Sequence, residues 1–311
     1  MSTMKAIRIH QYGGPEQLRY EDVPVPEAAD GHVLVRVHAA SVNPVDHKMA
    51  SGAYGKSSTL ASPWTPGADF SGVVEAIGPG VTSVKRGDAV YGDSRGGGAY
   101  AQFVAARADT IAPKPKKLSH VEAASVPVAA QTAWQALFDH GHLQGGQTAL
   151  IHAAAGGVGS FAVQLAHWKG AKVLATASAG NADYVRSLGA DQVIDYRATP
   201  FESAAKDVDM VLDLIGSETQ ARSFGVLKAG GYLVSAVGVR SPEEAGKHDV
   251  HAVAMTMLPS TEGLTRLAEL LDAATIRVVV TKTYPLAQAR DAWAQSMSGH
   301  TRGKIVLEVS A

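Results

Sequence analysis

Residues 152–159 carry a pattern that binds nucleotide phosphates. They read His-Ala-Ala-Ala-Gly-Gly-Val-Gly, which places Ala154, Gly156 and Gly159 at the three positions of a G-x-G-x-x-G fingerprint. A short apolar run precedes the loop and a stretch with helical periodicity follows it, as the fingerprint requires. Gly156 lets the backbone approach a diphosphate, Gly159 permits close helix–strand packing, and the N–H groups that open the helix attract negative charge. The residues expected to contact the coenzyme here are Ala155, Gly156, Gly157, Val158 and Gly159.

The residues after the next strand indicate which nucleotide binds. An acidic residue about 20 positions after the loop would bind the ribose 2′-hydroxyl of NAD. The second strand instead ends in Ala-Thr-Ala-Ser at residues 175–178, and the missing carboxylate favours the 2′-phosphate of NADP. We expect Ser178 to donate a hydrogen bond to this phosphate, and either Arg186 or Arg197 to supply positive charge, although each arginine alone also fits a solvated surface cation.

The overall composition excludes several classes of protein. Among 311 residues, 28 Lys+Arg against 29 Asp+Glu give a net charge of −1, so no basic field draws in nucleic acid or an anionic membrane. Zero cysteines exclude disulfides, a thiolate nucleophile, iron–sulfur clusters and sulfur-ligated zinc. No apolar run reaches the roughly 20 residues that span a bilayer, and the N-terminus lacks a signal-peptide core. We expect a soluble, cytoplasmic protein.

The histidines offer little further chemistry. His140 and His142, or His248 and His251, have the spacing of metal-ligand pairs, but such pairs on polar segments are more often solvated surface. No Ser–His–Asp or paired-carboxylate arrangement indicates a hydrolase.

The elements that position these residues fall into two regions. Up to about residue 121, short alternating segments are separated by Gly- and Pro-rich turns, which predicts a barrel-like β domain. The expected strands cover residues 5–9, 33–37, 72–77, 88–91 and 100–104.

After Pro127, strands alternate with helices, which predicts a doubly wound parallel sheet. The expected strands are 148–152, 172–176, 191–195, 210–213 and 231–235, and the expected helices are 159–168, 181–188, 218–227 and 263–274. A last strand at 303–309 could rejoin the first domain. The fold class is thus α/β, with a β-barrel domain and a doubly wound domain.

The chain resembles the zinc-independent medium-chain dehydrogenases/reductases, in particular the branch of quinone and enone oxidoreductases. The resemblance runs essentially from end to end. The matching segments are residues 40–46 (Ala-Ser-Val-Asn-Pro-Val-Asp), 66–74, 87–91, 154–159, 188–191 and 299–304.

The resemblance implies a GroES-like catalytic domain at residues 1–125, completed by 260–311, and a Rossmann domain at 126–259. It also implies NADPH in the cleft between them, and a homodimer formed through the Rossmann sheet edge. Asn43 and Tyr54 match polar residues of the nicotinamide pocket, and Asp46 could brace their loop. The other positions that match coenzyme contacts are Thr132, Tyr196, Leu214, Val237, Gly238, His300, Arg302 and Gly303.

Two departures from related patterns matter. Zinc alcohol dehydrogenases of this fold carry Cys and His where this chain has Asn43 and Ala68, so a catalytic zinc would have too few ligands. Relatives often carry Lys where this chain has Asn181, which removes one expected cation from the 2′-phosphate.

The leading hypothesis is an NADPH-dependent reductase of quinones or of α,β-unsaturated carbonyls. Asn43, Tyr54 or a hydroxyl of the coenzyme would then donate hydrogen bonds to the oxygen on which charge grows, and water or Tyr54 would supply the final proton. A 2-enoyl-thioester reductase is the first alternative, although only residues 114–117 (Lys-Pro-Lys-Lys) could form a docking patch. The second alternative is a nucleotide-binding sensor or accessory protein with little turnover.

Overall fold

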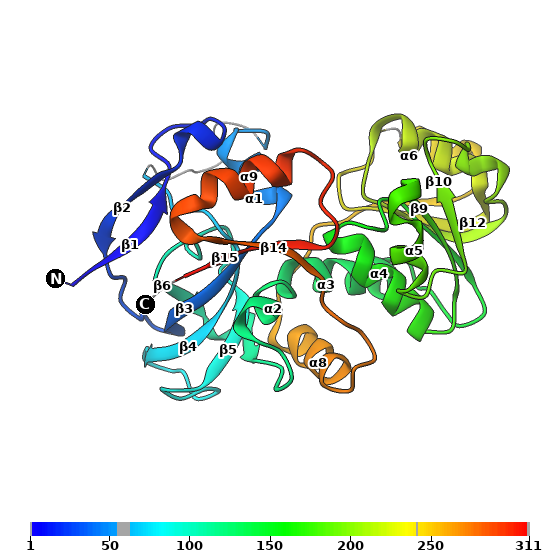
Figure 1. The fold of residues 1–311 in the computed structure, drawn as a ribbon. Coiled ribbons are helices and arrows are strands. Elements are labelled where there is room, and N and C mark those ends of the chain that lie inside the picture. The colour runs from blue at the N-terminus through cyan, green and yellow to red at the C-terminus, as the bar shows by residue number, and fades with distance from the viewer. Residues whose placement is uncertain (1, 55–62, 241, 310–311) are drawn as a thin grey trace. The chain divides into compact units, whose positions relative to one another are not determined.

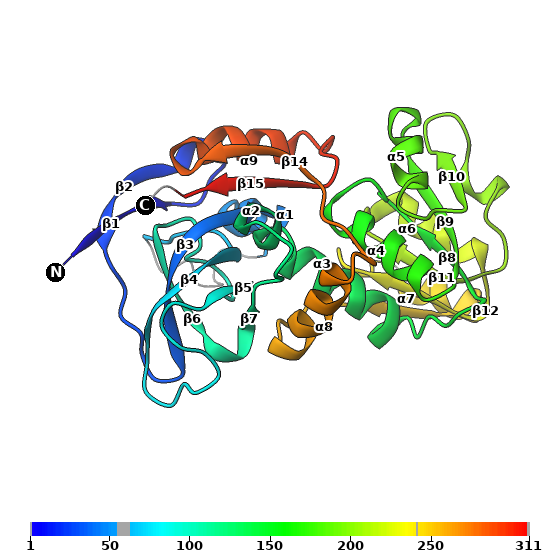
Figure 2. The same ribbon diagram turned by 60° about the horizontal axis from the view of Figure 1, so that its bottom comes forward.

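The computed structural model describes residues 2–54, 63–240 and 242–309. Its contacts divide the chain into two units (Figures 1 and 2). The first comprises Met1–Val128, Pro259–Ala274 and Val278–Ala311; the second comprises Ala129–Leu258 and Thr275–Arg277. The short segment Thr275–Arg277 groups with the second unit because the Arg277 backbone and guanidinium bond to Gln164 and Ser187.

The first unit is built mainly on antiparallel strands, although the last two strands of the chain pair in parallel. Its main sheet has the order β14-β15-β3-β4-β5-β7, and β6 also pairs with β3. In sheet order these strands are β14 (Val280–Pro285), β15 (Lys304–Glu308), β3 (His32–Val42), β4 (Asp69–Ile77), β5 (Ala89–Asp93) and β7 (Ile111–Pro113), with β6 at Phe103–Arg107. A separate antiparallel pair is formed by β1 (Thr3–Arg8) and β2 (Arg19–Pro24). The helices are α1 (Pro44–Ala50), α2 (His120–Ala124), α8 (Thr261–Asp272) and α9 (Ala289–Met297).

The C-terminal tail forms a strand of this sheet, as predicted. β15 lies next to β3 (Figures 1 and 2) and pairs with it antiparallel. Ile305 is opposite Val42 in this pairing. The strand expected at 100–104 is displaced, because β6 begins only at Phe103. Ala101 instead forms an isolated bridge with Ala6.

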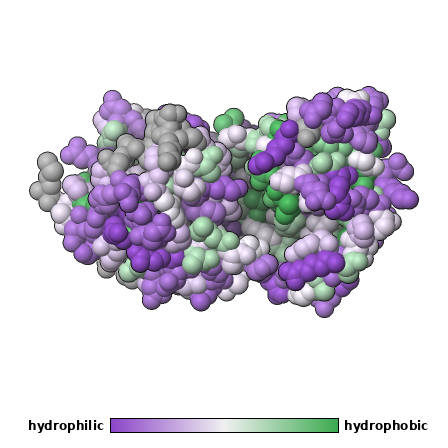
Figure 3. Space-filling model, turned by 90° about the horizontal axis from the view of Figure 1, so that it is seen from above, coloured by the Kyte–Doolittle hydropathy of each residue, from purple (hydrophilic) through white to green (hydrophobic). Residues whose placement is uncertain are grey.

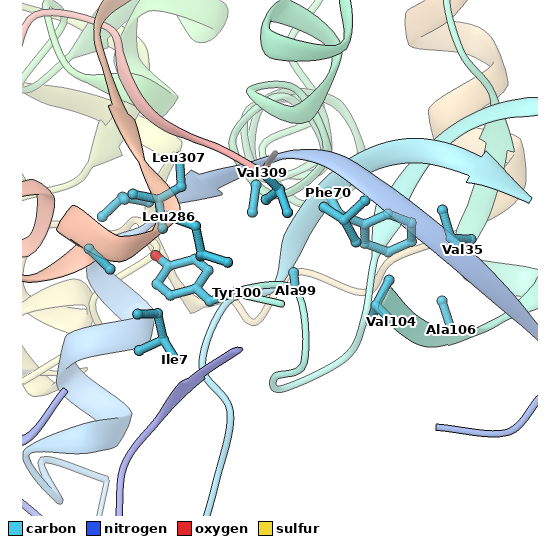
Figure 4. Close-up of a cluster of buried hydrophobic side chains, with 14 of the residues drawn as sticks. Ile7, Val35, Phe70, Ala99, Tyr100, Val104, Ala106, Leu286, Leu307 and Val309 are labelled. Carbon is cyan, nitrogen blue, oxygen red and sulfur yellow. The ribbon is translucent and has the colours of Figure 1, made fainter. Parts of the chain in front are cut away.

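The core of the first unit consists of one large apolar cluster and two smaller ones. Figure 4 shows Phe70 packed near Val35, Val104 and Ala106, while the Tyr100 ring lies near Ile7. Trp293 of α9 is fully buried in the same cluster, so α9 is held against the sheet by its apolar face.

The second unit is a parallel sheet with the order β10-β9-β8-β11-β12-β13. Numbered within the unit this order is 3-2-1-4-5-6, which is the Rossmann order, so the prediction of a doubly wound parallel sheet is confirmed. The strands are β8 (Thr148–Ile151), β9 (Lys172–Ala177), β10 (Gln192–Asp195), β11 (Val208–Asp213), β12 (Leu227–Ser235) and β13 (His251–Ala254). The helices are α4 (Gly157–Trp168), α5 (Ala182–Arg186), α6 (Ser217–Ser223) and α7 (Pro242–Lys247). α3 (Pro127–Trp134) spans the boundary between the units and continues as a π-helical turn, Gln135–His140.

On the face shown in Figure 3, hydrophilic residues predominate and hydrophobic surface occupies smaller areas. No helix within the described part of the chain combines the length and apolar character that crossing a bilayer needs.

Candidate functional site

The glycine loop connects β8 to α4 as its sequence pattern predicted. Gly156 is the N-cap of α4 and has an extended backbone. A Cβ on Gly159 would lie 2.3 Å from the carbonyl oxygen of Ala153, so glycine is required for α4 to pack directly on the loop. At Gly156 the nearest atom to an added Cβ would be the same oxygen at 3.3 Å, so the missing side chain mainly leaves the approach to the backbone open. The opening turn of this 12-residue helix therefore fits a diphosphate.

Five of the ten other predicted coenzyme contacts lie on the same edge of the sheet as this loop. The strands are parallel, so the residues that follow them share the carboxyl edge. The predicted contacts that follow a strand are Ser178 after β9, Tyr196 after β10, Leu214 after β11, and Val237 and Gly238 after β12. Thr132, which is buried, lies on α3 instead.

A buried carboxylate that the sequence analysis missed holds the loops after β11 and β12. Asp213 Oδ1 accepts hydrogen bonds from the backbone N–H groups of Ile215 (3.0 Å) and Gly216 (2.8 Å). Its Oδ2 accepts from Gln220 Nε2 (2.7 Å) and Ser235 Oγ (2.8 Å). Gln220 Nε2 also donates to the Gly238 carbonyl at 2.7 Å, so this network fixes the backbone at a predicted contact. The signal in the sequence that could have identified Asp213 is an aspartate at the end of an apolar strand.

His152, at the start of the glycine loop, is a buried, uncharged side chain that connects neighbouring elements. It is 1% exposed, and its ring nitrogens lie 3.1 Å from Thr176 Oγ1 and 2.9 Å from Ser223 Oγ. Burial lowers the pKa of His152 to about 4, so it carries no charge at neutral pH. It therefore ties β8 to β9 and α6 without attracting phosphate.

The two arginines proposed for the 2′-phosphate have different partners in the structure. Arg186 donates to Asp183 Oδ1 at 2.7 Å on its own helix, so its charge is already compensated. The Arg197 guanidinium lies 5.6 Å from the centre of the Tyr196 ring. The backbone N–H of Tyr196 bonds to the Ala177 carbonyl at 3.3 Å, which brings this pair next to Ser178.

In the first unit, Asn43 belongs to a buried polar network. It is 3% exposed; its Nδ2 donates to Asp69 Oδ2 at 2.8 Å and its Oδ1 accepts from Lys304 Nζ at 2.5 Å. Ser41 Oγ donates to the same Asp69 oxygen at 2.9 Å, and Asp69 Oδ1 accepts from the N–H of Val128 at 2.8 Å. Sequence reasoning placed Asp69 and Lys304 inside matching segments but gave them no role.

Asp46 braces the turn that carries Asn43. Its Oδ2 accepts hydrogen bonds from the N–H of Asn43 and from Tyr100 Oη, both at 2.9 Å. Tyr100 Oη in turn accepts from Trp293 Nε1 at 3.3 Å, which links α1 to α9. Burial, opposed by these hydrogen bonds, raises the pKa of Asp46 to about 7.

This shift predicts a pH-dependent stability. Between about pH 4 and pH 7 the unfolded chain releases the Asp46 proton while the folded protein keeps it, so rising pH favours unfolding in this window. We expect the free energy of unfolding of the wild type to fall by about 3 kcal/mol more than that of Asp46→Asn between pH 5 and pH 8. Urea unfolding of both proteins at the two pH values measures the difference. Burial also raises the pKa of Asp93, but this residue is present in both proteins, so its contribution cancels in the comparison. Parallel pH profiles would show that Asp46 is ionised throughout.

The remaining predicted residues lie in two exposed segments. Tyr54, 60% exposed, follows α1, and partial desolvation raises the pKa of its phenol, which is therefore protonated at neutral pH. His300 and Arg302 are exposed and Gly303 is buried, directly before β15. Between them the Thr301 hydroxyl oxygen is buried without a hydrogen-bond partner among the described residues, and a ligand's polar group would satisfy it.

The histidines do not form a metal centre among the residues that the structure describes, where no group of three or more His, Asp or Glu could hold an ion. Instead, His142 and His251 both contact the Tyr232 ring, and His248 stacks on Phe224.

Comparisons with known proteins agree with this architecture. The family described as Alcohol dehydrogenase GroES-like domain matches residues 29–116, and the family described as Zinc-binding dehydrogenase matches residues 188–307. The quinone oxidoreductase of Mus musculus is 34% identical over 98% of this chain and 97% of its own length. The 2-methylene-furan-3-one reductase of Solanum lycopersicum is also 34% identical, over 98% of this chain and 79% of its own length.

A solved structure of a quinone oxidoreductase has the same fold over nearly the whole chain. The quinone oxidoreductase of Escherichia coli, solved in complex with NADPH, has a TM-score of 0.90 at 29% identity and covers 99% of this chain and 100% of its own. The predicted pairing of a GroES-like domain with a Rossmann domain is therefore confirmed. This chain is an oxidoreductase that belongs to the quinone oxidoreductase branch of the medium-chain dehydrogenase/reductase superfamily.

Proposed function

We propose that this protein uses NADPH to reduce a quinone, or the carbon–carbon double bond of an α,β-unsaturated carbonyl, without a catalytic zinc. The observation that carries the proposal is the turn between β8 and α4, where a Cβ at Gly159 would collide with the backbone of Ala153. This turn lies next to the switch point of a Rossmann sheet, where dinucleotides bind. Relatives named for quinone and enone reduction support the substrate class.

The chain's own residues would bind and orient the coenzyme. When bound, NADPH supplies the hydride. The first N–H groups of α4 would hold the diphosphate. Ser178 would donate to the 2′-phosphate, and Arg197 would add positive charge beside it. The loops after β11 and β12, fixed by Asp213, would contact the rest of the dinucleotide.

Two side chains of the first unit would act on the reacting oxygen. Asn43 Nδ2 carries two hydrogens, and Asp69 is its one acceptor among the described residues. The second hydrogen would stabilise the negative charge that grows on the carbonyl oxygen. Tyr54, protonated at neutral pH, would donate a hydrogen bond or the final proton to the product.

The donor set does not fit a catalytic zinc. Ala68, at one of the positions that supply ligands in zinc alcohol dehydrogenases, has no donor atom, and Asn43 turns its amide to Asp69 and Lys304. Charge on the substrate oxygen would therefore be stabilised by hydrogen bonds.

Arg197 should distinguish NADPH from NADH. We expect Arg197→Ala to weaken NADPH binding by about 10-fold through loss of one charge-assisted contact, while NADH binding stays within about 2-fold. The matched control is Arg186→Ala, because that guanidinium is already paired with Asp183. Coenzyme titration followed by fluorescence measures all four affinities. Equal losses for both arginines, or for both coenzymes, would contradict the assignment.

The function itself is tested by following NADPH oxidation, with NADH as control, against small quinones, 2-alkenals, cyclic enones and enoyl thioesters. We expect turnover with quinones or enones. Turnover confined to thioesters would favour the enoyl-thioester reductase. Residues 114–117, the basic run that could dock an acyl carrier, are partly engaged within the chain, because the Lys114 ammonium donates hydrogen bonds to the Pro115 and Leu118 carbonyls. Binding of NADPH without consumption by any acceptor would instead indicate a sensor or accessory protein.

A further inference from the structure

An ion pair is buried around Asn43. Lys304 is 4% exposed and Asp69 is fully buried, and the Lys304 ammonium lies 3.6 Å from Asp69 Oδ2. Removing both charges from water is costly, and such a pair is weak evidence for stability because apolar residues often serve as well. Burial accordingly lowers the pKa of Lys304, against the opposing attraction of Asp69. The position of the pair therefore calls for a reason beyond stability.

The two charges fix the orientation of the Asn43 amide. An ammonium can only donate hydrogen bonds and a carboxylate can only accept them. Lys304 Nζ donates to Asn43 Oδ1 at 2.5 Å, and Asn43 Nδ2 donates to Asp69 Oδ2 at 2.8 Å. A flipped amide would face NH₂ to ammonium and oxygen to carboxylate, both repulsive. The ammonium on the oxygen side and the carboxylate on the nitrogen side therefore select the same orientation of the Asn43 amide.

The sheet places the three residues side by side. Asn43 follows the end of β3, Lys304 begins β15 and Asp69 begins β4, and β15, β3 and β4 are consecutive in the sheet. The backbone ladders already pair these strands without the side chains. Asn43 is also the N-cap of α1, and its side-chain amide bonds to Asp69 and Lys304.

We infer that Lys304 and Asp69 are positioning residues for the reduction: together they hold the Asn43 amide so that its second Nδ2 hydrogen is presented to the reacting carbonyl oxygen. The inference rests on the proposed function, in which Asn43 is the donor. The hydrogen bond from Lys304 to Asn43 Oδ1 also polarises the amide and strengthens its N–H groups as donors. The pair acts only through Asn43 and does not touch the substrate.

The test compares kcat and KM for NADPH in the full-length protein, with benzoquinone and cyclohexenone as probes. Lys304→Met removes the ammonium but keeps the length of the side chain. Asp69→Asn combined with Lys304→Met removes both charges, so it avoids leaving one buried charge unpaired. Each change is repeated in an Asn43→Ala background, and Lys228→Met, which breaks a distant ion pair with Asp209, is the control. Rates are corrected for the folded fraction measured by thermal unfolding.

We expect Lys304→Met and the neutral double variant to lower kcat about 100-fold, with the KM for NADPH within about 3-fold. In the Asn43→Ala background the same changes should alter kcat by less than about 3-fold, because the residue they act through is gone. A wild-type kcat in either folded variant, equal losses without Asn43, or failure of both variants to fold would overturn the inference in favour of a structural pair. A wild-type protein that binds NADPH without oxidising it would instead refute the proposed function.

Discussion

Replacing Gly159 with alanine is expected to weaken NADPH binding by about 100-fold, or about 2.7 kcal/mol. The added Cβ would lie 2.3 Å from the Ala153 carbonyl oxygen and 2.7 Å from the Ala154 Cα, and neither backbone atom can move without shifting the whole loop. α4 would have to separate from the loop, so the N–H groups that should hold the diphosphate would be displaced. The strain should also lower the free energy of unfolding by about 2 kcal/mol. Coenzyme titration and urea unfolding measure the two effects.

Two further alanine variants separate the causes. In Gly156→Ala, the added Cβ would contact only the Ala153 carbonyl oxygen, at 3.3 Å. We therefore expect this variant to preserve stability but to weaken NADPH binding, because the methyl group would obstruct the approach of the diphosphate to the backbone. Gly246 lies in α7 with nothing within 4 Å of an added Cβ, so Gly246→Ala should leave binding unchanged and raise stability by about 0.5 kcal/mol. Normal NADPH affinity in a folded Gly159→Ala protein would refute the assignment of this loop to the diphosphate.

Replacing Asn43 with alanine should lower kcat by about 100- to 1000-fold, the usual cost of removing one donor to a developing oxyanion. The change removes the Nδ2 hydrogens while the backbone N–H of residue 43 still bonds to Asp46. Coenzyme affinity should change far less than kcat, because the contacts proposed for the diphosphate belong to the second unit. Steady-state kinetics with NADPH and a quinone, followed by single-turnover measurements, separates the chemical step from binding.

Ser41→Ala is the matched control for Asn43→Ala. Ser41 Oγ donates to the same Asp69 oxygen as Asn43 Nδ2, at 2.9 Å and 2.8 Å, respectively. Its loss should destabilise the protein by about 1 kcal/mol while kcat falls by less than about 3-fold. If both variants reduced kcat equally, the network would be structural and Asn43 would not be the donor.

The local part of the site was predictable from the sequence. The glycine loop combines an apolar strand, two spaced glycines and a helical period within about 20 residues, and each of these signals is local. Strand–helix alternation likewise predicted the parallel sheet, and the carboxyl edge of parallel strands then brings Ser178 and Tyr196 together. In contrast, β2, β14 and α9 were not predicted, since their patterns are weak and α9 is held mainly through Trp293.

The sequence by itself determined the fold class, the glycine loop between a strand and a helix, and the family, because these depend on periodicity and on motifs within short segments. Only the tertiary structure decided which polar groups meet. Lys304 and Asn43 are 261 positions apart and touch because β15 pairs with β3, while Asp213 holds the Gly238 loop through Gln220 and Ser235. The ion pair between Arg186 and Asp183 likewise became visible only in the structure, and it is the reason why we propose Arg197 for the 2′-phosphate. Such contacts are set by strand register and side-chain direction, which no local pattern of residue types specifies.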